Sequence, residues 1–103
     1  MIVKDPAFPS EPRVALQRGF QQAESEFLKS AHLESGGGEV QRSGSCAIVV
    51  LIVGDIAYVA NTGDSRAIMC IDGGRNFVQL SRDHKPEDPD ETERIEKNGG
   101  KVY

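Results

Sequence analysis

The chain has 103 residues, of which 38% are hydrophobic and 27% charged, and its formal net charge is −4 at pH 7. This length allows one domain at most, or part of a larger one, and the composition is that of an ordinary soluble protein. The acidic balance gives no basic surface for nucleic acid. The longest apolar run, residues 46–53, is too short to span a membrane.

The N-terminal stretch carries no pattern of a secretory signal. Asp5, Pro6 and Pro9 interrupt it, so we expect an intracellular protein, cytoplasmic or nuclear. The same two prolines predict an extended or disordered lead-in over residues 1–12.

An amphipathic helix is expected next. Ser10 can cap its N-terminus, and Pro12 suits the first turn, where a missing N–H costs little. Apolar residues then recur at helical spacing, at Leu16, Phe20, Ala23, Phe27 and Ala31. This pattern predicts a helix that ends near His32 and packs its apolar stripe on a sheet.

A surface loop and a buried strand follow. Residues 34–42 contain three consecutive glycines and no apolar period, which is typical of a loop. Residues 46–53 are apolar at every position, whereas a half-exposed strand would alternate, so we expect this strand to be buried on both faces. Gly54 and Asp55 then suit a type II′ hairpin turn.

The next strands are expected at residues 56–61, 66–71 and 77–80, with a turn at residues 72–75. Short turns between successive strands predict an antiparallel meander from residue 46 to about residue 81.

A second helix is expected over residues 89–98. Asp88 can cap it, Glu91 completes a capping box, and the Asn-Gly-Gly run from Asn98 ends it with residues that tolerate positive φ. Residues 101–103 are interpreted as the beginning of another strand.

The two cysteines, Cys46 and Cys70, both fall inside predicted strands and lack metal-type spacing. We expect buried, reduced thiols and no disulfide, since free cysteine is usually buried.

Residues 58–67, Tyr-Val-Ala-Asn-Thr-Gly-Asp-Ser-Arg-Ala, place Asp64 at a tight turn between two strands. Three other motifs accompany this turn: Ser-Gly-Ser-Cys-Ala at 43–47, Leu-Ser-Arg-Asp-His-Lys-Pro at 80–86, and Glu-Arg-Ile at 93–95 followed by a Gly-Gly pair at 99–100.

These four motifs, in this order, closely resemble the middle of a metal-dependent protein phosphatase of type 2C, a Ser/Thr phosphatase. The resemblance covers residues 13–103 and corresponds to the central part of such a domain, truncated at both ends. It implies an α+β fold, in which an antiparallel β-meander with flanking helices forms part of a four-layer α-β-β-α sandwich. Cys46 stands where the family usually has Thr.

The resemblance implies that Asp64 helps to hold Mg²⁺ or Mn²⁺, as a ligand of a weaker metal beside a central pair. Hard divalent cations take oxygen ligands, and a metal-activated water can attack phosphorus without a covalent enzyme intermediate. The other interpretation of Asp64 is an Asx-type turn, in which the carboxylate accepts a nearby backbone N–H. The family's Asp-Gly-His-Gly segment has no counterpart here. We therefore expect the isolated chain to be inactive.

Other polar residues are expected to be structural. Arg66 suits pairing with a nearby carboxylate or carbonyl, with a phosphate contact as the alternative. Residues 83–86 read as a loop built by Asp hydrogen bonding and by Pro86, which favours an extended Lys85. His84 has only His32 as a possible companion, so a histidine metal site is not expected. Ser43 and Ser45 lack the base that a serine nucleophile needs, and a strand entry is expected there.

Two functions remain open. The first is the central part of an enzyme that dephosphorylates phosphoserine and phosphothreonine in phosphoprotein substrates. The alternative is a catalytically dead relative that acts as a binding scaffold, and the presence of Asp64 favours the enzyme. A third reading, an independent α/β interaction domain, is disfavoured because four ordered motifs would have to match by chance. The apolar strand at 46–53 predicts self-association, or a need for the rest of the domain.

Overall fold

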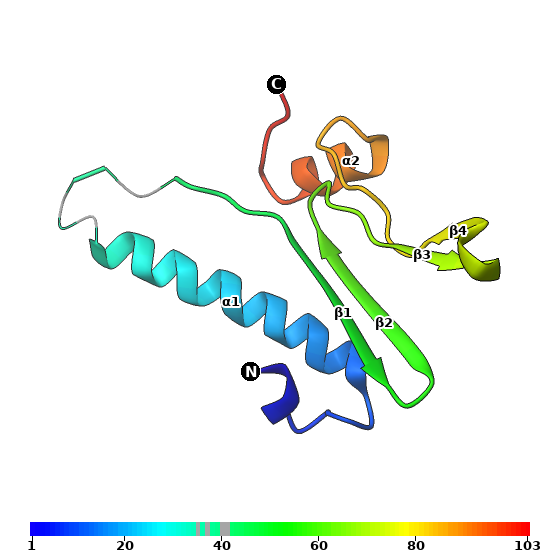
Figure 1. Ribbon diagram of the computed structural model, residues 1–103. Helices are drawn as coiled ribbons and strands as arrows, with labels where there is room; N and C mark the ends of the chain where they lie inside the picture. Colours follow the sequence, from blue (N-terminus) through cyan, green and yellow to red (C-terminus); the bar gives the residue numbers. More distant parts are fainter. Residues whose placement is uncertain (35, 37, 40–41) are drawn as a thin grey trace. The chain divides into compact units, whose positions relative to one another are not determined.

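The structure, a computed structural model, describes residues 1–34, 36, 38, 39 and 42–103. The expected loop over residues 34–42 therefore lies partly outside the described residues. The chain divides into two compact units, Met1–Gly44 with Val50–Tyr58, and Ser45–Val49 with Val59–Tyr103. Strands β1 (Ala47–Val53) and β2 (Ile56–Thr62) pair as a hairpin whose turn belongs to the first unit and whose open end belongs to the second (Figure 1).

The N-terminal segment of the first unit is folded, so the expectation of an extended or disordered lead-in is wrong. A 3₁₀ helix spans Ile2–Lys4, and turns lead to helix α1 (Pro12–Glu34). The carboxylate of Asp5 explains this order, because its Oδ1 accepts hydrogen bonds from the backbone N–H of Ala7 at 2.8 Å and from Arg18 Nη1 at 3.0 Å. One carboxylate thus links the lead-in to α1.

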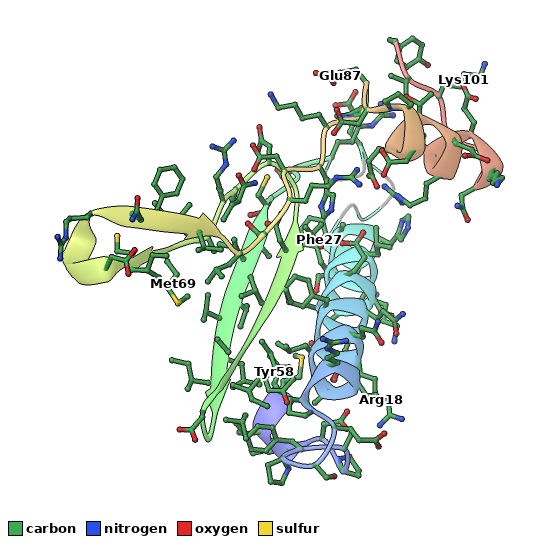
Figure 2. The ribbon with its side chains drawn as sticks, turned by 90° about the vertical axis from the view of Figure 1, so that its right-hand side faces the viewer. Arg18, Phe27, Tyr58, Met69, Glu87 and Lys101 are labelled. Carbon is green, nitrogen blue, oxygen red and sulfur yellow. The ribbon has the colours of Figure 1, made fainter. Side chains whose placement is uncertain are left out.

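Helix α1 has Pro12 in its first turn, as expected, and extends two residues past His32. The expected cap at Ser10 is wrong, because Ser10 lies two residues before the helix and its hydroxyl donates to the carbonyl of Ala7 at 3.3 Å. Its apolar stripe is buried only near its two ends, where Leu16 and Ala31 are each 3% exposed. Phe27, in the middle of the stripe, is 41% exposed; Figure 2 shows its side chain on the helix. The sequence period therefore predicted the helix correctly, while burial along the stripe is incomplete.

The hairpin of β1 and β2 forms where the apolar runs predicted it. Gly54 has a φ of 60° and Asp55 has no positive φ, which agrees with the type II′ turn. The expectation that the first strand is buried on both faces is wrong for the described chain, because Val50 is 50% and Ile52 71% exposed. A two-stranded sheet has no neighbouring strand on either side, and its side chains are covered only where another element packs on them.

The second unit contains a second hairpin, formed by β3 (Ile68–Ile71) and β4 (Asn76–Gln79). These strands are antiparallel, with Met69 opposite Val78. The four strands form two separate two-stranded sheets, so the expected continuous meander is wrong at its centre, where β2 and β3 do not pair. The reason is local: residues 63–67 are not in strand conformation, and the backbone of Ala67 bonds to the segment after β4 instead.

Helix α2 (Pro89–Lys97) starts at the expected proline and ends one residue before Asn98, with Gly99 at a φ of 81°. The predicted capping box is wrong. Asp88 makes no side-chain cap, because its Oδ2 accepts the backbone N–H of Lys85 at 3.2 Å. Residues 101–103 have no regular structure, so the expected strand is not formed there.

Over the described residues, two α-helices and two antiparallel hairpins make this an α+β fold, as expected. The four-layer sandwich stays a prediction. Among the described residues, neither helix combines the length and the apolar character that a membrane crossing requires.

Candidate functional site

Asp64 lies just after β2, in the bend between the two hairpins, and its side chain is exposed. Gly63 precedes it with a φ of 101°, a backbone conformation that is strained for residues with a side chain. The sequence pattern therefore placed Asp64 correctly, at a turn that follows a strand.

The side chain of Asp64 accepts a hydrogen bond from Cys46, the residue before β1. The thiol of Cys46 lies 3.6 Å from Asp64 Oδ1, which is a weak hydrogen bond from sulfur to a carboxylate oxygen. The expectation that both cysteines are buried is wrong, since Cys46 and Cys70 are exposed free thiols. Cys46 also lies just outside β1, contrary to the expectation that both cysteines fall inside strands, while Cys70 lies in β3, whose two-stranded sheet is only partly covered.

Asp64 fits a role as one ligand of a hard cation. Its carboxylate is exposed, and carboxylate oxygens are what Mg²⁺ and Mn²⁺ prefer. Within the part of the chain that the structure describes, however, no three His, Cys, Asp or Glu side chains gather around one point. The described residues thus do not form a complete metal site by themselves.

The turn around Asp64 is attached to the segment that follows β4. The carbonyl of Gly63 accepts the backbone N–H of His84 at 3.0 Å, and the N–H of Ala67 donates to Ser81 Oγ at 2.9 Å. The side-chain amide of Asn61 donates to the carbonyl of Arg82 at 2.8 Å. These bonds lie on both sides of Asp64 in the sequence, so they hold the turn from both ends.

Arg66 has the structural role that the sequence favoured. Its Nε donates to Asp83 Oδ1 at 3.0 Å and its Nη2 to Asp83 Oδ2 at 2.6 Å, a two-pronged ion pair. The hydrogen bond from Arg66 is the main reason that the pKa of Asp83 is lowered, and the same bond raises the pKa of Arg66. Asp83 is therefore a charged partner of the turn and not an acid–base group.

The loop at residues 83–86 is held by aspartates, as expected, although by two different means. Asp83 pairs with Arg66, while Asp88 accepts the N–H of Lys85. Thr92 adds a hydrogen bond from its Oγ1 to the carbonyl of Pro86 at 2.7 Å. This loop therefore joins the turn at its start to α2 at its end.

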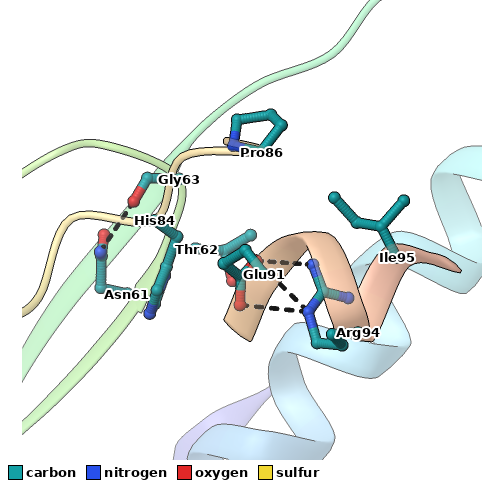
Figure 3. Close-up of a pocket in the computed structure, with 8 residues that line it drawn as sticks. All are labelled: Asn61, Thr62, Gly63, His84, Pro86, Glu91, Arg94 and Ile95. Atoms are coloured by element: carbon teal, nitrogen blue, oxygen red, sulfur yellow. Dashed lines mark hydrogen bonds and ion pairs between the residues drawn. The ribbon is translucent and has the colours of Figure 1, made fainter. Parts of the chain in front are cut away.

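A hollow of about 430 Å³ lies beside this loop (Figure 3). Its lining combines the end of β2, the loop and α2, and consists of Asn61, Thr62, Gly63, His84, Pro86, Glu91, Arg94 and Ile95. Glu91 and Arg94 form an ion pair at 2.8 Å in it. The hydrogen bond from Arg94 to the carboxylate of Glu91 is the main cause of the lowered pKa of Glu91, and the charges of Arg94 and His84 make smaller contributions.

Sequence reasoning missed the role of Asn61. Its Nδ2 donates to two carbonyls, those of Gly63 and Arg82, and its Oδ1 is buried without a partner among the described residues. A signal was available, because asparagine side chains in turns often hydrogen-bond to the backbone two residues further on, and Gly63 is two residues after Asn61.

The chain matches the family model of protein phosphatase 2C over residues 1–103. It is similar to probable protein phosphatase 2C 59 of Arabidopsis thaliana, with 42% identity over 98% of the chain and 30% of that protein. It is also similar to probable protein phosphatase 2C 45 of Oryza sativa subsp. japonica, with 41% identity over 98% of the chain and 33% of that protein. No solved structure matches the chain.

The fold and the matches define one class of protein, and the chain belongs to the protein phosphatase 2C family. The resemblance of its four motifs to type 2C phosphatases is thereby confirmed. The chain spans about a third or less of the length of the curated relatives it matches.

Proposed function

We propose that this chain is the central part of a metal-dependent phosphatase domain that removes phosphate from serine and threonine of phosphoproteins. The family match over the whole chain supports the reaction class. The observation that carries the proposal is the exposed carboxylate of Asp64, on a turn that hydrogen bonds hold at both ends.

In this proposal Asp64 supplies one oxygen ligand to a Mg²⁺ or Mn²⁺ ion. Such an ion, when bound, lowers the pKa of a water and screens the charge on phosphate. The part of this chain is to hold the carboxylate at a defined place: Gly63 allows the bend, and Cys46 contacts one carboxylate oxygen.

The other ligands must come from outside the described residues, in which no group of three candidate ligands gathers. We therefore expect the 103-residue chain to be inactive by itself and to work as part of a complete domain. A metal ion needs several ligands to bind tightly, and one carboxylate leaves it mostly hydrated.

The test is hydrolysis of a phosphopeptide by the complete domain that contains this chain, measured against Mn²⁺ and Mg²⁺ concentration. Asp64→Ala is expected to lower turnover sharply and to be partly rescued by more metal, since a weakened site refills by mass action. The matched control is Asp55→Ala, which removes an exposed aspartate from the turn at the opposite end of β2.

A different result would contradict the proposal. If Asp64→Ala leaves turnover unchanged and lowers only the melting temperature, Asp64 is a structural residue of the turn. If the complete domain shows no metal-dependent hydrolysis at all, the binding-scaffold alternative is favoured instead.

A further inference from the structure

The carboxylate of Asp64 has little that holds it directly. Among the described residues, its hydrogen-bond partner is the thiol of Cys46 at 3.6 Å, and a thiol is a weak hydrogen-bond donor. The position of Asp64 must therefore be set mainly by its neighbours in the turn. The residue with the strongest connection among them is Arg66.

Arg66 lies two residues after Asp64, and its guanidinium binds Asp83 with two bonds, at 3.0 and 2.6 Å. Two parallel N–H···O bonds restrain the orientation of both groups, whereas a single bond would leave rotation free. The backbone next to Asp83 is attached as well, because the N–H of His84 donates to Gly63 on the other side of Asp64. Asp83 and His84 thus bind the residues on either side of Asp64, namely Arg66 after it and Gly63 before it.

This ion pair contributes little to overall stability. The Arg66 side chain is 55% exposed and that of Asp83 22% exposed, and ion pairs at the surface typically stabilise a protein only slightly. Its removal should leave the fold intact. Its main consequence is therefore geometric, namely where the turn and its carboxylate lie.

We infer that Asp83 is a positioning residue for Asp64, acting through its two-pronged ion pair with Arg66. This inference rests on the proposed function, because it assigns Asp83 a role in the metal affinity that Asp64 provides. Asp83 itself binds no metal and touches no substrate in this assignment.

The test compares Asp83→Asn with Asp90→Asn in the complete domain. Asp90 pairs with Arg82 Nη2 at 2.6 Å, so its variant removes a surface aspartate–arginine ion pair and leaves the pair of Arg66 with Asp83 in place. Mn²⁺ affinity is measured by titration calorimetry, and the order of the turn by hydrogen exchange of the amides at residues 63–67. Thermal unfolding checks that each variant is folded.

Asp83→Asn is expected to weaken Mn²⁺ binding on the order of tenfold, the usual effect of losing a partner that orients a ligand. Turnover should recover at saturating Mn²⁺, and exchange at residues 63–67 should be faster. Asp90→Asn should match the wild type in both respects. In the double variant with Asp64→Ala, the added Asp83→Asn should change nothing further, since both act on the same ligand.

If Asp64→Ala weakens Mn²⁺ binding, two results would overturn this inference while leaving the proposed function in place. The first is an Asp83→Asn protein that matches Asp90→Asn in affinity and exchange. The second is an additive loss in the double variant, which would show that Asp83 acts independently of Asp64. If Asp64→Ala leaves Mn²⁺ binding unchanged, the proposed function fails and this inference falls with it.

Discussion

The sulfur of Cys46 lies where residue 63 would need room for a side chain. A Cβ added to Gly63 would overlap with Cys46 Sγ and lie 2.9 Å from Cys46 Cβ. The backbone of Gly63 also has a φ of 101°. The two residues are thus packed in a way that only a glycine at position 63 allows, directly beside Asp64.

The first prediction concerns this contact. Gly63→Ala combines a strained φ with a clash, so it should lower the free energy of unfolding by at least about 2 kcal/mol. Gly54→Ala is the matched control, because Gly54 also has a positive φ but has open space around it. Chemical denaturation of both variants measures the difference. Equal losses would mean that the contact with Cys46 contributes nothing.

The second prediction concerns the exposed thiols. Both cysteines should react with iodoacetamide in the folded chain. Alkylation of Cys46 should displace the turn of Asp64, because its sulfur touches Gly63 and Asp64. In the complete domain, alkylation should therefore reduce turnover, and Cys46→Ser should prevent this loss. Cys70→Ser, which keeps Cys46, should not protect. Peptide mass spectrometry with activity measurements would decide, and unchanged turnover after full labelling of Cys46 would refute the prediction.

The third prediction concerns acid stability. The pKa of Asp83 in the folded chain lies below its ordinary value because Arg66 hydrogen-bonds the carboxylate, with smaller effects from the charges of Arg66, Lys85 and His84. Stabilisation by this pair is therefore complete above the ordinary carboxyl pKa, about 3.9, and is lost as the pH falls through the lower folded value.

The melting temperatures of wild type and Asp83→Asn should accordingly differ by a small, constant amount from about pH 8 to pH 5, and should converge below about pH 4. Arg66→Gln should behave in the same way, because it removes the other half of the pair. A difference that persists at the lowest pH would assign it to packing and not to the ion pair.

The fourth prediction concerns self-association of the 103-residue chain. In the part of the chain that the structure describes, every strand is an edge strand of a two-stranded sheet. Apolar side chains such as those of Ile52 and Phe77 are 71% and 68% exposed. Such edges and surfaces recruit other chains. Sedimentation velocity should show larger species as the concentration rises.

Replacing Ile52 and Phe77 by lysine should shift the chain toward monomer, since charge on an exposed strand opposes pairing. Gln79→Lys introduces the same charge at an exposed polar position of β4 and should have a smaller effect. A wild-type chain that stays monomeric at high concentration would show that the prediction is wrong.

Local chemistry was sufficient for the two α-helices, for the two hairpins and for the place of Asp64. The helical spacing of apolar residues predicted α1, the proline at residue 89 predicted the start of α2, and the glycine at residue 54 predicted the turn of the first hairpin. These features depend on residues a few positions apart, so their physical causes can be read along the chain. For the same reason Asp64 was correctly expected at a turn after a strand.

Only the tertiary structure decided which distant residues meet. Arg66 and Asp83 are 17 residues apart, and Cys46 and Asp64 are 18 apart, so their contacts depend on how the chain returns after each hairpin. The cap of α2 was mispredicted for a local reason, because the carboxylate of Asp88 accepts the backbone N–H of Lys85, three residues before it. Burial was misjudged at Cys46, which lies outside β1, and at Cys70 in β3, because an apolar sequence predicts a strand whereas its exposure depends on what packs against it.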